Sequence, residues 1–209
     1  MIVSKTGNRK RKADTIILSA AFVILSIVLL FSSLFAIMQS FYFDYAFEKY
    51  DVYERFERER ALEANENILD FLNHENSLDS NFLMEDEISH LEDVRHILDR
   101  IKLIYHFSLV LLFVLLIIYG HEIFKVSSTI LLILFIFLLI YYIFGFDFVF
   151  LRFHQIFFTG NYAFDPSVSN MKAIYPDGLF MFFSQLFYLK TVIKTIILTL
   201  SWKYLYSPK

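Results

Sequence analysis

The chain of 209 residues contains no cysteine, and it has few prolines, few glycines and a single tryptophan. The absence of cysteine excludes a disulfide framework, a thiol nucleophile and a thiolate metal site. Apolar residues are abundant instead: hydrophobic types make up 57% of the sequence, and the mean hydropathy is +0.53. Because these residues are gathered in long blocks, the composition indicates an integral membrane protein.

Four apolar runs have at least the length that a membrane-spanning helix needs, about 17 residues. We place the spans at residues 15–40, 103–119, 128–150 and 179–205. The first run is longer than the roughly 7–15 apolar residues of a secretory signal peptide, so it is interpreted as a retained anchor. The segments outside the spans are 1–14, 41–102, 120–127, 151–178 and 206–209. The predicted fold class is an all-α integral membrane protein with four transmembrane helices.

Charge predicts the side of the membrane on which each segment lies. The N-terminal segment 1–14 is rich in lysine and arginine, which favours the cytoplasm. Four spans return the chain to the same side, where Lys203 and Lys209 agree with a cytoplasmic C-terminus. The turn at 120–127 is then cytoplasmic, whereas 41–102 and 151–178 lie outside.

The block at 41–102 has no proline or glycine, and its acidic residues outnumber its basic ones. Its apolar periodicity predicts two or three amphipathic helices, which we interpret as an extracytoplasmic helical cap. Its acidity argues against nucleic acid as a partner, because phosphate recognition needs a basic surface. Aromatic residues crowd its first part, where they fit the core of the cap or a belt at the lipid headgroups, so membrane lipids are expected partners.

Two lysines conflict with this scheme. Lys190 and Lys194 lie one helical turn apart within the fourth apolar run. A lysine at mid-bilayer costs about 2.5–3.5 kcal/mol in insertion experiments. Three explanations stay open: the first part of the run is interfacial, the lysines face the helix bundle, or their long side chains reach the membrane surface.

One histidine of the cap lies beside apolar positions. At about 100° per residue, His90 falls at the edge of an apolar stripe within residues 84–101, and His96 falls on the opposite, charged side. His90 is therefore predicted to face packing and His96 to face water. Their spacing is not the i, i+4 spacing of a two-histidine metal site, so a metal on this helix is not expected.

A second histidine, His154, follows the third span among aromatic residues. The second and third spans are joined by a short turn, which predicts that they are antiparallel neighbours. Connectivity therefore brings His90 and His154 to the same side of the membrane and close together. A single histidine at a helix end is also typical of an interfacial or satisfied polar residue, and His106 inside the second span is the alternative catalytic group. The remaining histidines are assigned to the cytoplasmic turn and to the cap surface, namely His121 and His74.

The layout of a basic N-terminus, one span, an acidic cap and three further spans resembles the bacterial lipoprotein intramolecular transacylases. Two motifs carry the resemblance: Ile88-Ser-His-Leu-Glu-Asp-Val-Arg95, and Phe153-His-Gln-Ile-Phe-Phe158 followed by Phe164-Asp-Pro166. The resemblance extends over nearly the whole chain. It departs from the family at Tyr162-Ala163, where relatives are expected to carry a tryptophan, and at the two lysines of the fourth span.

The resemblance implies a four-helix enzyme of the bacterial cell membrane with an extracytoplasmic cap. The implied reaction moves the sn-2 acyl chain of a diacylglyceryl lipoprotein to the α-amino group of its N-terminal cysteine, giving the lyso form. His90 and His154 correspond by motif to the two histidines that carry the reaction. The expected substrate-binding residues surround the second histidine: Arg152, Phe153, Phe157, Phe158, Tyr162, Phe164 and Asp165. Asp165 is also a turn former, since proline follows it. No cofactor and no metal are implied.

This chemistry suits the residues. An acyl shift from ester to amine needs a neutral amine, and a free α-amino group has a pKa of about 7.7–8.0. A histidine that titrates near neutrality can take the proton that the amine loses, and a second donor can stabilise the oxyanion or protonate the leaving glyceryl oxygen. An acyl-enzyme is not needed, in agreement with the lack of cysteine and of a serine elbow motif. The sequence allows either histidine to be the base and the other to be the acid, and we favour His154 as the base.

Two other functions fit the same sequence. One is a non-enzymatic four-helix membrane protein whose acidic cap senses or binds a partner. The other is a small transporter with Lys190 and Lys194 along its path, although the inverted repeat and paired broken helices of many such folds are missing.

Overall fold

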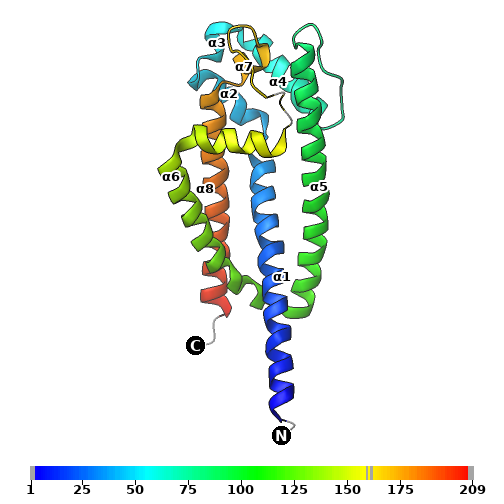
Figure 1. Cartoon of the computed structure of the whole chain (residues 1–209), viewed down its shortest axis with the longest axis vertical. Coiled ribbons are helices and arrows are strands. Elements are labelled where there is room, and N and C mark those ends of the chain that lie inside the picture. The colour runs from blue at the N-terminus through cyan, green and yellow to red at the C-terminus, as the bar shows by residue number, and fades with distance from the viewer. Residues whose placement is uncertain (1–2, 159, 161, 207–209) are drawn as a thin grey trace. The chain divides into compact units, whose positions relative to one another are not determined.

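The computed structural model describes residues 3–158, 160 and 162–206, without the side chains of 3–13, 40, 121 and 205–206. The side chains of the predicted basic N-terminal cluster therefore lie outside the described residues. All regular elements in these ranges are helices, and Figure 1 shows four long ones: α1 (Val3–Ile37), α5 (Glu85–Tyr119), α6 (Ser127–Phe157) and α8 (Asp177–Ser201). The shorter elements are α2 (Ser40–Lys49), α3 (Val52–Arg55), α4 (Arg58–Leu72), α7 (Asn170–Ile174), a 3-10 turn at Gly120–Val126 and a π-helical turn at Trp202–Tyr206.

Among the described residues, four stretches are long and apolar enough to cross a membrane: Asp14–Ile37, Glu85–Tyr119, Glu122–Phe157 and Asp177–Tyr204. Large apolar side chains on them point outward; for example, Phe107 is 64% exposed, Ile117 is 69% exposed and Ile143 is 70% exposed. Helices that satisfy their own backbone and expose apolar side chains suit lipid rather than water. The prediction of an all-α membrane protein with four spanning helices is confirmed.

The chain divides into two compact units. The first unit comprises Met1–Ser33, Leu103–Leu139 and Tyr188–Lys209, and the second comprises Leu34–Lys102 and Ile140–Phe187. Each long helix contributes residues to both units. The core of the first unit joins α1 to α6 through leucine, valine and isoleucine side chains, namely Leu25, Leu29, Val126, Ile130 and Leu134.

Polar side chains inside the first unit find partners there. The Lys194 ammonium donates to the Ser32 hydroxyl of α1 at 2.9 Å. The Thr199 hydroxyl donates to the Ser127 hydroxyl at 2.8 Å. Of the three explanations for the lysine pair, the structure therefore selects the second for Lys194: its side chain faces another helix of the bundle.

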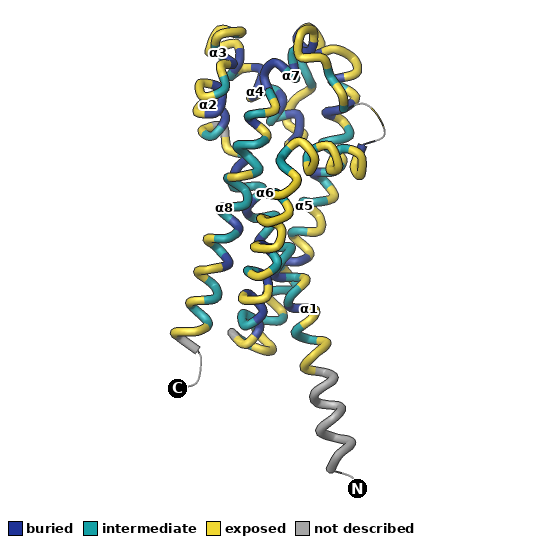
Figure 2. Tube along the Cα trace, turned by 60° about the vertical axis from the view of Figure 1, so that its left-hand side comes forward, coloured by how far each residue is buried: buried dark blue, intermediate teal, exposed yellow. Residues whose placement is uncertain are grey.

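The core of the second unit is built from α2, α3, α4 and α7 together with the first turns of α5 and α8, and Figure 2 shows many buried positions in this part of the chain. Phe47 is fully buried, and its ring lies 6.3 Å from that of Tyr175. The Tyr175 hydroxyl donates to the Asn65 amide oxygen at 2.9 Å, so this buried polar pair is satisfied. The predicted helical cap is thus a packed structure with an aromatic core.

Two boundaries predicted from the sequence fall inside helices of the structure. α5 runs unbroken from Glu85 to Tyr119 across the predicted end of the cap at 102, because no proline or glycine interrupts it. The predicted loop at 151–178 begins with helix, since α6 continues to Phe157 and α7 follows.

The helix α6 changes direction at Gly145, which has φ 78° and ψ 168°. This region of backbone conformation is open essentially to glycine alone. Residues 146–157, here called the arm, form a second helical stretch after the bend (Figure 1). Its inner face packs on α8, where the rings of Phe150 and Phe180 lie 5.2 Å apart. The bend therefore determines where the aromatic and histidine-bearing end of α6 lies within the second unit.

Candidate active site

Two histidines from separate helices meet in the second unit. His90 lies one turn into α5 and is 8% exposed, and His154 lies near the end of the arm and is half-buried. Their ring centroids are 6.3 Å apart, and the ring planes are inclined by 17°. The proximity predicted from connectivity is confirmed. His96 is exposed, as the helical periodicity predicted.

The sequence around His90 explains its position. The first turn of α5 carries Glu85 and Asp86, whose negative charges favour a helix N-terminus. Leu91 is 5% exposed and Leu98 is 8% exposed, and both belong to the core of the second unit. Because His90 precedes Leu91 at the edge of this buried stripe, its ring is held against the protein interior rather than in solvent.

Aromatic rings enclose the two histidines. Phe158 lies beside both, with its ring centroid 4.7 Å from that of His90 and 5.3 Å from that of His154. Phe164 meets His90 edge-on at 5.5 Å, and Tyr162 lies 5.4 Å from His154. The Phe153 ring is 5.5 Å from that of His154. The four residues Phe153, Phe158, Tyr162 and Phe164 are called the aromatic shell. The shell gives the histidines apolar surroundings.

The orientation of His154 is fixed by its own helix. Its Nδ1 lies 2.8 Å from the backbone oxygen of Phe150, one turn earlier in the arm. A carbonyl oxygen can only accept a hydrogen bond, so Nδ1 carries the proton. In the neutral imidazole, Nε2 is then the unprotonated nitrogen. This arrangement leaves the lone pair of Nε2 as the basic centre of the ring.

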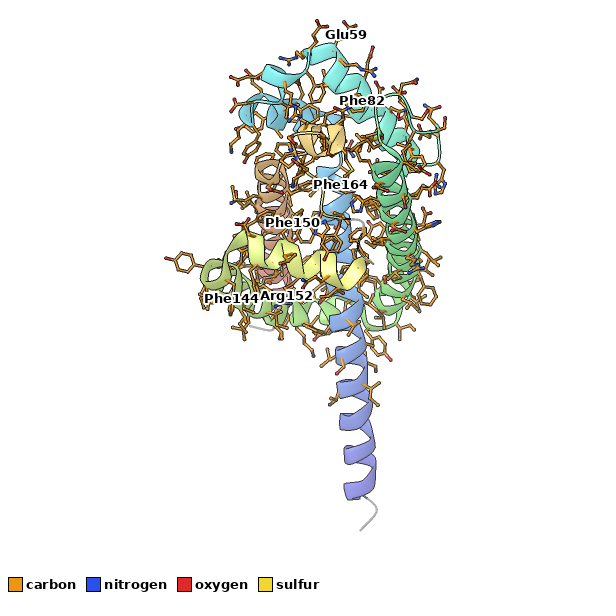
Figure 3. All side chains as sticks on the ribbon, turned by 45° about the horizontal axis from the view of Figure 1, so that its top comes forward. Glu59, Phe82, Phe144, Phe150, Arg152 and Phe164 are labelled. Atoms are coloured by element: carbon orange, nitrogen blue, oxygen red, sulfur yellow. The ribbon has the colours of Figure 1, made fainter. Side chains whose placement is uncertain are left out.

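Two of the predicted substrate-binding residues have no ring contact with either histidine among the contacts of the described residues. Arg152 is exposed; it donates to the Gln155 side-chain oxygen at 2.9 Å, and its guanidinium lies 5.2 Å from the centre of the Phe148 ring. It sits about 200° around the arm from His154, and Figure 3 shows it on the side opposite Phe150. Phe157 contacts Phe153, with ring centroids 4.8 Å apart.

Asp165 forms a turn. Its Oδ1 accepts hydrogen bonds from the backbone N–H of Ser167 at 2.8 Å and from the Ser167 hydroxyl at 2.7 Å. The backbone hydrogen bond, with help from the hydroxyl, holds the pKa of the Asp165 carboxyl below its usual value. This carboxylate shapes the segment that follows Phe164.

The other histidines lie outside this pair. His74 is exposed on the cap and pairs with the Asp99 carboxylate at 2.9 Å. His106 belongs to the first unit, is exposed, and has its ring 5.6 Å from that of Tyr105. The side chain of His121 lies outside the described residues. Within the described part of the chain, no three metal-binding side chains gather at one point.

One buried carboxylate near the site was not singled out from the sequence. Glu87 is fully buried, and it accepts hydrogen bonds from the backbone N–H groups of Met84 at 2.7 Å and Met171 at 3.0 Å, and from the Ser169 hydroxyl. The sequence does contain a signal for Glu87, because this residue lies three positions before His90 and in line with the apolar stripe. A carboxylate on an apolar stripe indicates a buried group that accepts hydrogen bonds inside the protein, rather than one of the exposed acidic residues of the cap surface.

Fold and site together define a class: a four-span membrane protein with two histidines among aromatic rings in its second unit. The family model of the lipoprotein intramolecular transacylase Lit matches residues 17–180 of this chain. The chain therefore belongs to the lipoprotein intramolecular transacylase family and is an acyltransferase. This membership decides against the non-enzymatic and transporter alternatives.

Solved structures share the fold. The membrane integral lipoprotein intramolecular transacylase Lit from Bacillus cereus matches with a TM-score of 0.78 at 14% identity, covering 93% of this chain and 96% of that chain. A variant of the same protein, with one histidine replaced by arginine, matches with a TM-score of 0.81 at 15% identity, covering 97% and 96%. Comparison with curated protein sequences gave no match.

Proposed function

We propose that this chain transfers the sn-2 acyl chain of a diacylglyceryl lipoprotein to the α-amino group of the lipoprotein's N-terminal cysteine. The product is the lyso-form lipoprotein. The observation that carries the proposal is the meeting of His90 and His154 inside the aromatic shell, in a chain that belongs to this family. The two rings are close enough to act on the groups of one ester and its attacking amine.

In the proposed reaction, the amine nitrogen attacks the ester carbonyl carbon. The new bond joins nitrogen to the acyl carbon, and the bond from that carbon to the glyceryl oxygen breaks. The amine loses one proton and the glyceryl oxygen gains one, so the product has the mass of the substrate. Because both reacting groups belong to one molecule, orientation supplies much of the rate enhancement.

His154 takes the proton from the attacking amine in this proposal. The hydrogen bond from Nδ1 to the Phe150 carbonyl supports the assignment, because it leaves Nε2 as the basic nitrogen. His90, on the other helix, stabilises the oxyanion and gives a proton to the leaving glyceryl oxygen. Two histidines with opposite tasks return to their starting states when the proton has passed from one to the other.

The aromatic shell is proposed to hold the acyl chains and to exclude water from the reacting ester. Phe158, 8% exposed and beside both histidines, is its central member. Arg152 lies on the far side of the arm, so we assign it to a lipid phosphate rather than to the acyl carbonyl. Asp165 acts through its turn, which places Phe164.

We propose further that both termini are cytoplasmic and that the histidines lie at the outer surface of a bacterial cell membrane. The lack of native cysteine allows a direct test with single substitutions. A membrane-impermeant maleimide should label Glu59→Cys in intact cells and Tyr204→Cys only after permeabilisation, since both positions are exposed. The reverse pattern would overturn the orientation.

Mass spectrometry of a lipoprotein's N-terminal lipopeptide tests the reaction. The host makes diacylglyceryl lipoproteins, and the lipopeptide is analysed with and without this chain. We expect one acyl chain to move from glycerol to the cysteine nitrogen at unchanged total mass. His90→Ala and His154→Ala should abolish the shift, whereas the exposed control His96→Ala should keep it. An unchanged lipopeptide in cells that contain the inserted protein would refute the proposal.

A further inference from the structure

We infer that Glu87 is a positioning residue for this site: its buried carboxylate holds the segment that carries Phe164 in place beside His90. The inference rests on the proposed function, because it assumes that His90 takes part in the reaction. Glu87 has no contact with the reacting groups in this scheme. It acts through the backbone and the side chains that it ties together.

The contacts of Glu87 join two parts of the chain. One carboxylate oxygen, Oε2, accepts from the backbone N–H of Met84, just before α5. The other, Oε1, accepts from the Ser169 hydroxyl and from the backbone N–H of Met171, at the start of α7. The carboxylate is fully buried, so it bridges the start of α5 and the start of α7 out of contact with water.

The bridged segment leads directly to the aromatic shell. Phe164, at its beginning, lies 5.5 Å from the His90 ring. Two further tethers hold the segment: the exposed Arg55 donates to the Pro166 carbonyl at 2.6 Å, and the Asn170 amide donates to the Phe82 carbonyl at 2.7 Å. Glu87 lies one helical turn before His90 on the same helix, so it connects the segment directly to the helix that carries His90.

The choice of a carboxylate is informative. Burial of a charged group is costly unless donors satisfy it, and an apolar pair of similar volume packs two helices at least as well. A buried carboxylate with three donors instead fixes one geometry. A glutamine would turn an NH2 group toward the Met84 N–H or toward the two donors at the start of α7, because its two ends are no longer both acceptors. One side of the bridge must then open.

The chain itself offers a clean experiment, since it has no native cysteine. Spin labels are attached to Val168→Cys, at a position 65% exposed, and to His96→Cys, which is exposed on α5. Pulsed electron resonance then measures the distance between them in detergent-solubilised protein. We expect a narrow distribution with native Glu87 and a broad one in E87Q. The matched control is E92Q, which changes an exposed glutamate of the same helix.

Kinetics of the unlabelled variants complete the test. E87Q should lower the rate at saturating lipopeptide by about tenfold to a hundredfold, because small displacements at a reacting centre have effects of this size. KM should change little, and E92Q should match the wild type. An unchanged distance distribution in E87Q would overturn the inference, and so would a broadened one with a wild-type rate.

Failure of the proposed function is a separate result. It would be seen as no acyl migration with the native protein, or as a wild-type rate in His90→Ala, whereas the distance measurement does not depend on activity. If E87Q does not yield folded protein, Ser169→Ala replaces it, because this substitution removes one of the three donors. The same distance broadening with a smaller loss of rate would support the inference, and neither change would overturn it.

Discussion

The bend at Gly145 offers the most direct perturbation of the site. Gly145→Ala adds a single methyl group to a residue with φ 78° and ψ 168°. Beyond the adjoining residues and the nearby backbone of its own helix, the added Cβ would meet no heavy atom within 4 Å. The substitution therefore acts on backbone conformation and not through a clash.

The size of the effect follows from that conformation. A residue other than glycine in such a region costs about 1–3 kcal/mol. This cost lowers the ratio of the bent form to a straighter helix by about 5- to 150-fold. Because the arm carries His154 to its place 6.3 Å from His90, straightening separates the two rings. The transacylation rate should fall with the population of the bent form, by at most this factor.

The assay is the initial rate of acyl migration in a purified lipopeptide, followed by mass spectrometry at equal amounts of folded protein. Gly120→Ala is the control, since Gly120 also has a positive φ, of 59°, and space for a Cβ, but lies in the turn before α6. It should lower thermal stability and leave the rate unchanged. A wild-type rate in Gly145→Ala would refute the idea that the bend brings the histidines together.

Three further outcomes are expected. Tyr175→Phe leaves the buried Asn65 oxygen without its donor and should lower the free energy of unfolding by about 1–3 kcal/mol in chemical denaturation. The double variant Tyr175→Phe with Asn65→Leu should recover most of this loss. An unchanged free energy of unfolding in the single variant would contradict the reasoning. Asp165→Asn removes a carboxyl whose pKa is lowered by hydrogen bonds from Ser167. The lowered pKa stabilises the folded state at pH values above the unfolded-state pKa, and this stabilisation is lost as pH falls through the folded-state pKa. The thermal stability of this variant should therefore decline less than that of the wild type below about pH 4, and equal declines would count against the turn. Lys194→Leu should improve insertion of the fourth span in the full chain by about 2.5–3.5 kcal/mol, measured by a glycosylation-based insertion assay, and an unchanged yield would contradict that reasoning.

The spanning helices and the face of His90 could be predicted because both follow from periodicity, which is a local property. Long apolar runs specify membrane helices whatever their neighbours are. The stripe through Leu91 and Leu98 likewise gives the direction of His90 without knowledge of any partner. The meeting of His90 with His154 needed one further step, the short turn between two antiparallel spans.

The arm could not be predicted in the same way. A lone glycine in an apolar run is compatible with a straight helix, and its positive φ is decided by tertiary packing. Because residues 151–157 follow the third apolar run and precede several chain breakers, the sequence indicates a loop there, and a loop has no helical angle between Arg152 and His154. The grouping of Arg152 with the aromatic residues followed from nearness in sequence, and the helix separates them. The Ser32 partner of Lys194 likewise depends on a contact between distant segments.

The hydrogen bond from His154 to the Phe150 carbonyl affects how sensitive the site is to point mutation. In many enzymes a carboxylate side chain orients the histidine base, and a single codon change can delete that partner. Here the partner is a peptide group, which every amino acid at position 150 would supply. The alignment of this imidazole is therefore insensitive to point mutation at its acceptor and depends on the helical path of the chain. Genetic loss of the alignment requires a change that breaks the helix.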